Sequence, residues 1–322
     1  MTARCIGLAA VIAALAVLAT LLKRSDVYLM TLCCVYLMAT MGLNLTVGYA
    51  GQMSLGQAAF FGIGAYHAAI LLKLGWPFFV VLPIAAVACF MIGLALGFPA
   101  LRVQHHYLAF ATLGFNILVF LVMRNEEKIT GGTFGVSAIP RPTVLGMSTE
   151  GHLAYFYFTL VSLVALAAVL WWLLRSPWGR AFAALRDNPI RAESLGVNIT
   201  AYTLLAFAIG AACAGVGGVY YASLVEFIEP GPFHFSTSLM MLLAVIVGGS
   251  GRFFGPVVGT IIIILLPEAL RASNMEALKF MQKWYLVFFG VAVVILMVWL
   301  PGGILSLFDR WKKAPRIEAA KP

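Results

Sequence analysis

The sequence predicts an all-α polytopic membrane protein with about ten transmembrane helices in a single domain, residues 1–322. Of the 322 residues, 62% are hydrophobic and only 10% are charged, whereas a soluble domain carries about 25% charged residues. The 21 basic and 12 acidic residues are gathered in short clusters. The gaps between these clusters are long enough for membrane spans of about 20 apolar residues.

The predicted spans follow these gaps in order. They lie near residues 5–22, 27–48, 57–72, 78–99, 107–123, 153–174, 202–222, 238–250, 256–270 and 284–300. The third, eighth and ninth are short enough to be partly re-entrant or broken. The first is interpreted as a retained helix and not as a signal peptide, because Lys23 and Arg24 follow it and the next span begins at once.

Lys and Arg in the short loops favour an orientation with both termini in the cytoplasm. This orientation places 12 of the 21 basic residues inside, including those of a loop at 175–201 and of a basic tail at 309–322. The net charge of +9 is then explained by a basic cytoplasmic face beside membrane lipid. No nucleic-acid partner is expected.

Several enzyme and cofactor motifs are missing from the sequence. The nearest approach to a phosphate-binding loop, VGGSGRFFG at 247–255, lacks the lysine that would hold phosphates. The five histidines are scattered, there is no H-E-x-x-H or G-x-S-x-G, and the five cysteines have no metal-ligand spacing. We therefore expect a chain that is no enzyme, binds no metal or cofactor, and takes its energy from another polypeptide.

A glycine-rich stretch, residues 47–66, lies within a long run without charged residues. Irregular backbone at membrane depth is tolerated only where protein or a water-filled cavity satisfies its amides. Broken helices near the midplane also form substrate sites in transporters. The Val-Gly and following Gly of 47–51 recur 200 residues later at 247–251, which hints at an internal repeat.

Polar side chains accompany this stretch, and we predict that they line a substrate pathway. The predicted pathway residues are Asn44, Gln52, Ser54, Gln57, His67, Thr112 and Asn116. Thr112 and Asn116 are four positions apart and share a helix face. Hydrogen bonding between packed helices is the alternative explanation for all seven.

The loop at 175–201 has the signals of two short helices. Ser176 and Pro177 form a start signal, Asn188 and Pro189 repeat it, and Gly196 supplies a stop. A capped, charged insert is more than membrane orientation requires, so we predict a protein-docking role, with lipid headgroups as the alternative. The candidate contact residues are Arg180, Phe182, Leu185, Arg186, Asp187, Asn188, Pro189, Arg191 and Glu193.

Four segments of the sequence closely resemble the permease subunits of bacterial branched-chain amino-acid ABC transporters, of the LivM type. They are GLNLTVGYAGQMSLGQAAFFGIGAY (42–66), TGGTFGVSAIP (130–140), GRAFAALRDNPIRAESLGVN (179–198) and VGGSGRFFGPVVGT (247–260). The resemblance runs in order from about residue 36 to 303.

The resemblance implies an importer in the bacterial inner membrane. Its pore would pair this chain with a second permease of the LivH type. Two cytoplasmic ATPase subunits would bind ATP and Mg²⁺ and dock on the loop at 175–201, and a periplasmic binding protein would deliver substrate.

The sequence also departs from the family pattern. Ile190, Arg191 and Ala192 replace a common Glu-Ala-Ala pattern. TLGFNI at 112–117 lacks an acid that family members often carry, and His67 falls where a small residue is common. The last two departures concern the substrate, so a urea or short-amide permease stays open as an alternative. A stand-alone channel or carrier is the alternative of a different class.

Overall fold

A computed structural model describes residues 19–20, 22–100, 105–144, 147–149, 151–272, 299 and 302–306, and all structural statements below concern this part of the chain. The long elements are α2 (Arg24–Leu43), the π-helix η1 (Asn44–Tyr49), α3 (Gln57–Lys73), α4 (Phe78–Ala100), α5 (His105–Asn125), α7 (His152–Arg175), α10 (Ile199–Val225), α11 (Phe235–Gly248) and α12 (Gly255–Ala272). The loops carry α6 (Glu127–Thr130), η2 (Gly132–Phe134), the two-residue strands β1 (Thr143–Val144) and β2 (Met147–Ser148), α8 (Pro177–Asp187), α9 (Pro189–Ser194) and η3 (Gly231–Phe233).

The predicted fold class, an all-α polytopic membrane protein, is confirmed. Each predicted span from the second to the ninth corresponds to one long helix, whereas the spans near 5–22 and 284–300 and the tail at 309–322 lie outside the described residues. Within the described residues, five helical segments are long and apolar enough to cross a membrane, and parts of α11 and α12 form shorter apolar helices.

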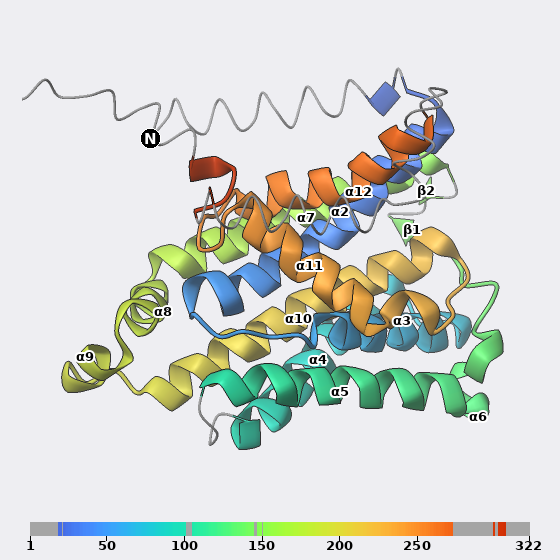
Figure 1. The fold of residues 1–322 in the computed structure, drawn as a ribbon. Coiled ribbons are helices and arrows are strands. Elements are labelled where there is room, and N and C mark those ends of the chain that lie inside the picture. Colours follow the sequence, from blue (N-terminus) through green and yellow to red (C-terminus); the bar gives the residue numbers. More distant parts are fainter. Residues whose placement is uncertain are drawn as a thin grey trace, which may run out of the picture.

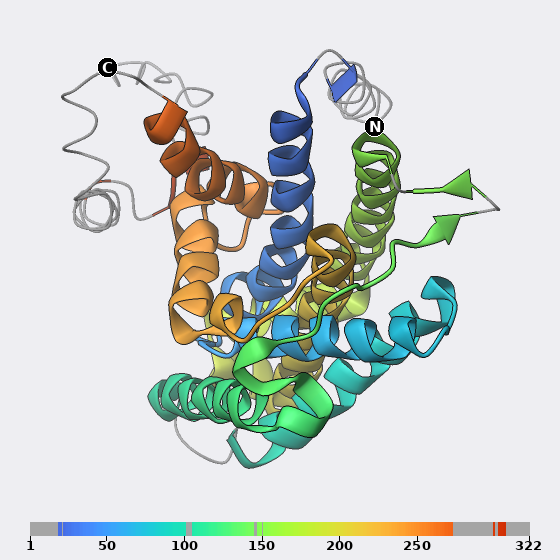
Figure 2. The same ribbon diagram turned by 90° about the vertical axis from the view of Figure 1, so that its right-hand side faces the viewer.

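Helix α10 occupies the centre of the bundle and packs against α2, α3 and α4. Figure 2 looks along the bundle and shows α2 between α7 on one side and the α11–α12 pair on the other, in agreement with the contacts of α2. The contact between α3 and α10 is made by backbone. A Cβ added at Gly218 would lie 1.9 Å from Phe61 O, and one added at Gly64 would lie 2.1 Å from Gly215 O. Small residues therefore set the spacing of this pair.

The two longest loops lie at opposite ends of the bundle. Figure 1 shows α8 and α9 at one end and α6, β1 and β2 at the other. The helix order thus separates the predicted docking loop from the loop that follows α5, as expected if the two face opposite sides of a membrane.

Candidate functional site

The helix that begins at Arg24 does not end cleanly but passes into the π-helix η1. The Asn44 side chain at the start of η1 reaches a turn more than 200 residues away. Its Nδ2 donates to Arg252 O (2.9 Å), and its Oδ1 accepts from Gly251 N (2.9 Å). A Cβ at Gly48 would lie only 2.3 Å from Gly251 N. The two glycine-rich segments with the similar Val-Gly pattern are therefore in direct contact, and short π-helical turns frequently mark functional sites.

Gln57 is the first residue of α3, and its side chain bonds to two other helices. Its Nε2 donates to Ala39 O in α2 (2.8 Å) and to Gly210 O in α10 (3.1 Å). In the irregular segment before α3, Thr112 Oγ1 accepts from Leu55 N (2.9 Å). The bond to Leu55 N satisfies an amide of the irregular segment, whereas the Gln57 bonds go to carbonyls within the helices α2 and α10.

Asn116 lies one turn after Thr112 on α5 and faces α11. Its Nδ2 donates to Ser238 Oγ (3.2 Å), which also accepts from Ala58 N (2.8 Å), whereas its buried Oδ1 has no hydrogen-bond partner among the described residues. Ser238 was not among the predicted pathway residues, and only its place at the start of a predicted span could have indicated it. His67 is half-buried, and its Nδ1 lies 2.9 Å from Ile63 O in its own helix.

Six of the seven predicted pathway residues are thus buried, and His67 is separate from them. The six are Asn44, Gln52, Ser54, Gln57, Thr112 and Asn116. Several of them bond to backbone of neighbouring elements, which is the geometry that the packing alternative describes. Their place in a substrate pathway stays a prediction.

The loop between α7 and α10 folds as the sequence predicts. Ser176 Oγ accepts from Trp178 N (3.1 Å) at the start of α8, and Asn188 Oδ1 accepts from Arg191 N (3.0 Å) at the start of α9. Gly196 ends the second helix with a φ of +85°. Two caps and two helix-initiating prolines make this loop a defined surface and not a flexible connection.

The apolar residues of this loop divide into two groups. Phe182 and Leu185 are buried within the chain, and the Phe182 ring contacts the Tyr202 ring of α10 edge-on at 6.1 Å. They fix α8 to the bundle and do not face outward, so their predicted role as outward-facing contact residues is wrong. Ile190 and Leu195 were not among the predicted contact residues, and they are 79% and 82% exposed. The pattern of hydrophobic residues alone does not show which of them pack on the chain's own helices and which face outward.

The charged residues of the loop also divide. Arg180, Asp187, Arg191 and Glu193 are exposed. Arg186 is exposed as well, but its Nη1 turns toward the bundle and donates to Gly48 O (2.5 Å). The α8–α9 loop and the segment where α2 passes into η1 are therefore joined by a side chain.

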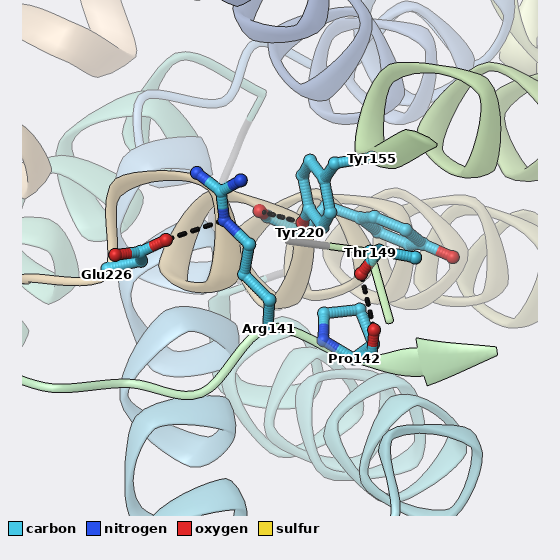
Figure 3. A network of polar contacts seen from close by, with 6 residues as sticks. All are labelled: Arg141, Pro142, Thr149, Tyr155, Tyr220 and Glu226. Carbon is cyan, nitrogen blue, oxygen red and sulfur yellow. Dashed lines mark hydrogen bonds and ion pairs between the residues drawn. The ribbon is translucent and has the colours of Figure 1, made fainter. Parts of the chain in front are cut away.

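At the opposite end, the loop after α5 is fastened to the end of α10. Val136 and Ile228 pair through two backbone hydrogen bonds, of 2.8 and 3.0 Å. Figure 3 shows Arg141 pointing toward Glu226, with Nε 2.6 Å from Oε1, and its guanidinium lies 5.7 Å from the centre of the Tyr155 ring. Arg141 was not among the residues predicted from the sequence.

Figure 3 also shows how this fastening continues into the bundle. Tyr155 donates its hydroxyl hydrogen to Tyr220 O (2.7 Å), which joins α7 to α10, and Thr149 Oγ1 donates to Pro142 O within the loop. The loop after α5 therefore lies across the ends of α7 and α10 and is held there by polar contacts.

Comparison with known proteins gives the family. A family model described as "Branched-chain amino acid transport system / permease component" matches residues 25–298. The chain belongs to this permease family. The permease is 34% identical over 311 residues to the high-affinity branched-chain amino acid transport system permease protein LivM of Escherichia coli K12, and 33% identical over 311 residues to LivM of Salmonella typhimurium LT2. Each alignment covers 89% of the permease and 71% of the relative.

A more distant relative has a different named cargo. The permease is 26% identical over 263 residues to the autoinducer 2 import system permease protein LsrC of Escherichia coli K12 / DH10B, which covers 77% of the permease and 71% of the relative. No solved structure matches the permease. The resemblance stated from the sequence is confirmed, and the permease is a multi-pass membrane protein.

Proposed function

We propose that the permease is a transmembrane subunit of an ATP-driven importer that moves branched-chain amino acids into the cytoplasm. The main support is the capped loop α8–α9, a rigid surface at one end of a bundle that carries a broken helix. The names of the LivM relatives support the cargo. ATP and Mg²⁺ are bound by partner subunits and not by this chain.

The partners that complete this proposal are two ATPase subunits, a second permease of the LivH type and a periplasmic binding protein, all at the bacterial inner membrane. The ATPase surface consists of the exposed and half-exposed residues Arg180, Asp187, Asn188, Pro189, Ile190, Arg191, Glu193 and Leu195. Ile190 and Leu195 are its apolar anchors, because burying an exposed Leu or Ile side chain on docking contributes about 1.5–3 kcal/mol. Phe182 and Leu185 hold this surface in place from beneath.

The first test is transport by the complete complex in proteoliposomes. With the co-encoded ATPases, second permease and binding protein, labelled leucine, isoleucine or valine should accumulate only when MgATP is present on the ATPase side. The controls are a vesicle without the permease and a competition series with urea, acetamide and autoinducer 2. Uptake of leucine without ATPases would contradict the importer and support a carrier, and competition by urea or autoinducer 2 alone would contradict the cargo.

The second test concerns the pathway residues. Gln57→Leu removes two interhelical hydrogen bonds of 2.8 and 3.1 Å, each worth about 0.6 kcal/mol in a membrane, so we expect the complex to assemble. If Gln57 lines the pathway, uptake should fall at least tenfold at unchanged protein level.

The control for this test is Thr159→Val, which removes a buried hydroxyl that donates to Tyr155 O one turn earlier in α7. It should leave uptake near the unmodified rate. Normal uptake in both Gln57→Leu and Gln52→Leu would leave the polar residues as packing contacts and contradict the pathway role.

A further inference from the structure

The Arg186 side chain lies at a point where three distant segments of the chain meet. It extends from α8, passes beside Gly51 in the segment after η1, and reaches Gly48 and Gly251. Its Nη1 is 2.5 Å from Gly48 O. A Cβ on Gly51 would lie 3.4 Å from Arg186 Cα, and one on Gly251 would lie 1.8 Å from Arg186 Nη1.

The Gly48 carbonyl is open to this bond because the helix breaks there. In a continuing α-helix the amide of Gln52 would donate to Gly48 O. It donates to Thr46 O instead (2.9 Å). Gly48 is buried, so its backbone carbonyl needs a donor, and a charged guanidinium gives a stronger hydrogen bond than a neutral group.

The glycines explain why an arginine fits. Gly51 and Gly251 have φ values of +70° and +75°, in the region that favours glycine. A side chain on Gly251 would occupy the position of the guanidinium. The two similar Val-Gly segments therefore touch each other where the Arg186 guanidinium ends.

The two Val-Gly segments are also joined by hydrogen bonds. Asn44 lies four residues before Gly48 in η1, and its side-chain amide bonds to Gly251 N and Arg252 O. A displacement of Arg186 is consequently applied to η1 directly and to the turn at 249–252 through Asn44.

We propose that Arg186 is the positioning residue that passes movement of the docking loop to the broken helix and to the turn at 249–252. This role differs from the one expected from sequence, in which Arg186 is a contact residue for the ATPase. It rests on the proposed function, because the movement comes from the docked ATPase.

The experiment compares R186A, R186K and R191A in the assembled complex, with R24A as a matched control. Arg24 is exposed in the first turn of α2. Three quantities are measured, namely ATPase co-purified with the permease, ATP hydrolysed and substrate moved. For R186A we expect co-purification and hydrolysis within twofold of the unmodified complex, and at least a tenfold fall in substrate moved per ATP. R186K keeps an N–H donor of similar reach and should recover at least a third of the ratio.

The other variants separate this role from docking. R191A should reduce co-purification and leave the ratio of substrate to ATP unchanged, and R24A should change none of the three quantities. The proposal is overturned if R186A keeps the normal ratio, or if its only effect is loss of co-purified ATPase. If R186A does not accumulate, R186K and R186Q decide, since only the lysine should restore the ratio. An unmodified complex without ATPase would instead contradict the proposed function itself.

Discussion

Gly218→Ala will separate α3 from α10 and lower the free energy of unfolding by about 3 kcal/mol. The added methyl group would lie 1.9 Å from Phe61 O, and because the obstacle is backbone, no rotamer change can relieve the overlap. Overpacking in a dense interior costs about 1–3 kcal/mol, and this site belongs at the upper end of that range. Unfolding of the purified permease in mixed micelles, followed by far-ultraviolet circular dichroism, measures the loss.

Gly114→Ala is the matched control for this substitution. Gly114 is also a helical glycine, but a Cβ there would meet nothing within 4 Å among the described residues. Alanine should raise stability by up to about 1 kcal/mol through helix propensity. Equal stability of the two variants would mean that α3 and α10 do not meet by direct backbone contact.

Ile190→Ala combined with Leu195→Ala will weaken ATPase binding by about 2–4 kcal/mol, roughly 30- to 700-fold in Kd. Both side chains are about four-fifths exposed, so their truncation removes little packing within the chain. If they enter a groove of the ATPase, the contact loses its apolar centre. Binding of purified ATPase to the permease in nanodiscs provides the measurement.

Ile129→Ala is the control for the docking residues. Ile129 is 62% exposed and lies in α6, at the end of the bundle opposite α8 and α9. It should leave ATPase binding unchanged. A double variant that binds as tightly as the Ile129 variant would contradict docking through α9 and favour a role of this loop at the lipid surface.

Local features of the fold were predictable because their causes are local. Charge clusters separate the spans, and Ser176 and Asn188 are helix caps that need only the residues beside them. The capped loop was therefore predicted with its corner in the correct place.

Features that depend on distant segments were not predictable. The sequence cannot say whether an apolar face packs on its own bundle or on a partner, which is why Phe182 and Leu185 were assigned to the outer surface. The contact of Arg186 with residues 48 and 251 requires two segments 200 residues apart to meet. The ion pair of Arg141 requires the loop after α5 to fold back on α10. The weak similarity between residues 47–51 and 247–251 did not predict that these two segments touch.

The central helix α10 connects the two ends of the molecule without interruption. It has 27 residues, about 40 Å at 1.5 Å per residue, more than the roughly 30 Å hydrocarbon core of a bilayer. Asn198 caps its first turn directly after α9, and Glu226 at its far end pairs with Arg141. A continuous helix of this length is a stiff connection between the loop after α5 and the α8–α9 loop. If a partner at the loop after α5 shifts α10, it changes the affinity for a partner at α8–α9, and by linkage the second partner changes the affinity for the first by the same factor.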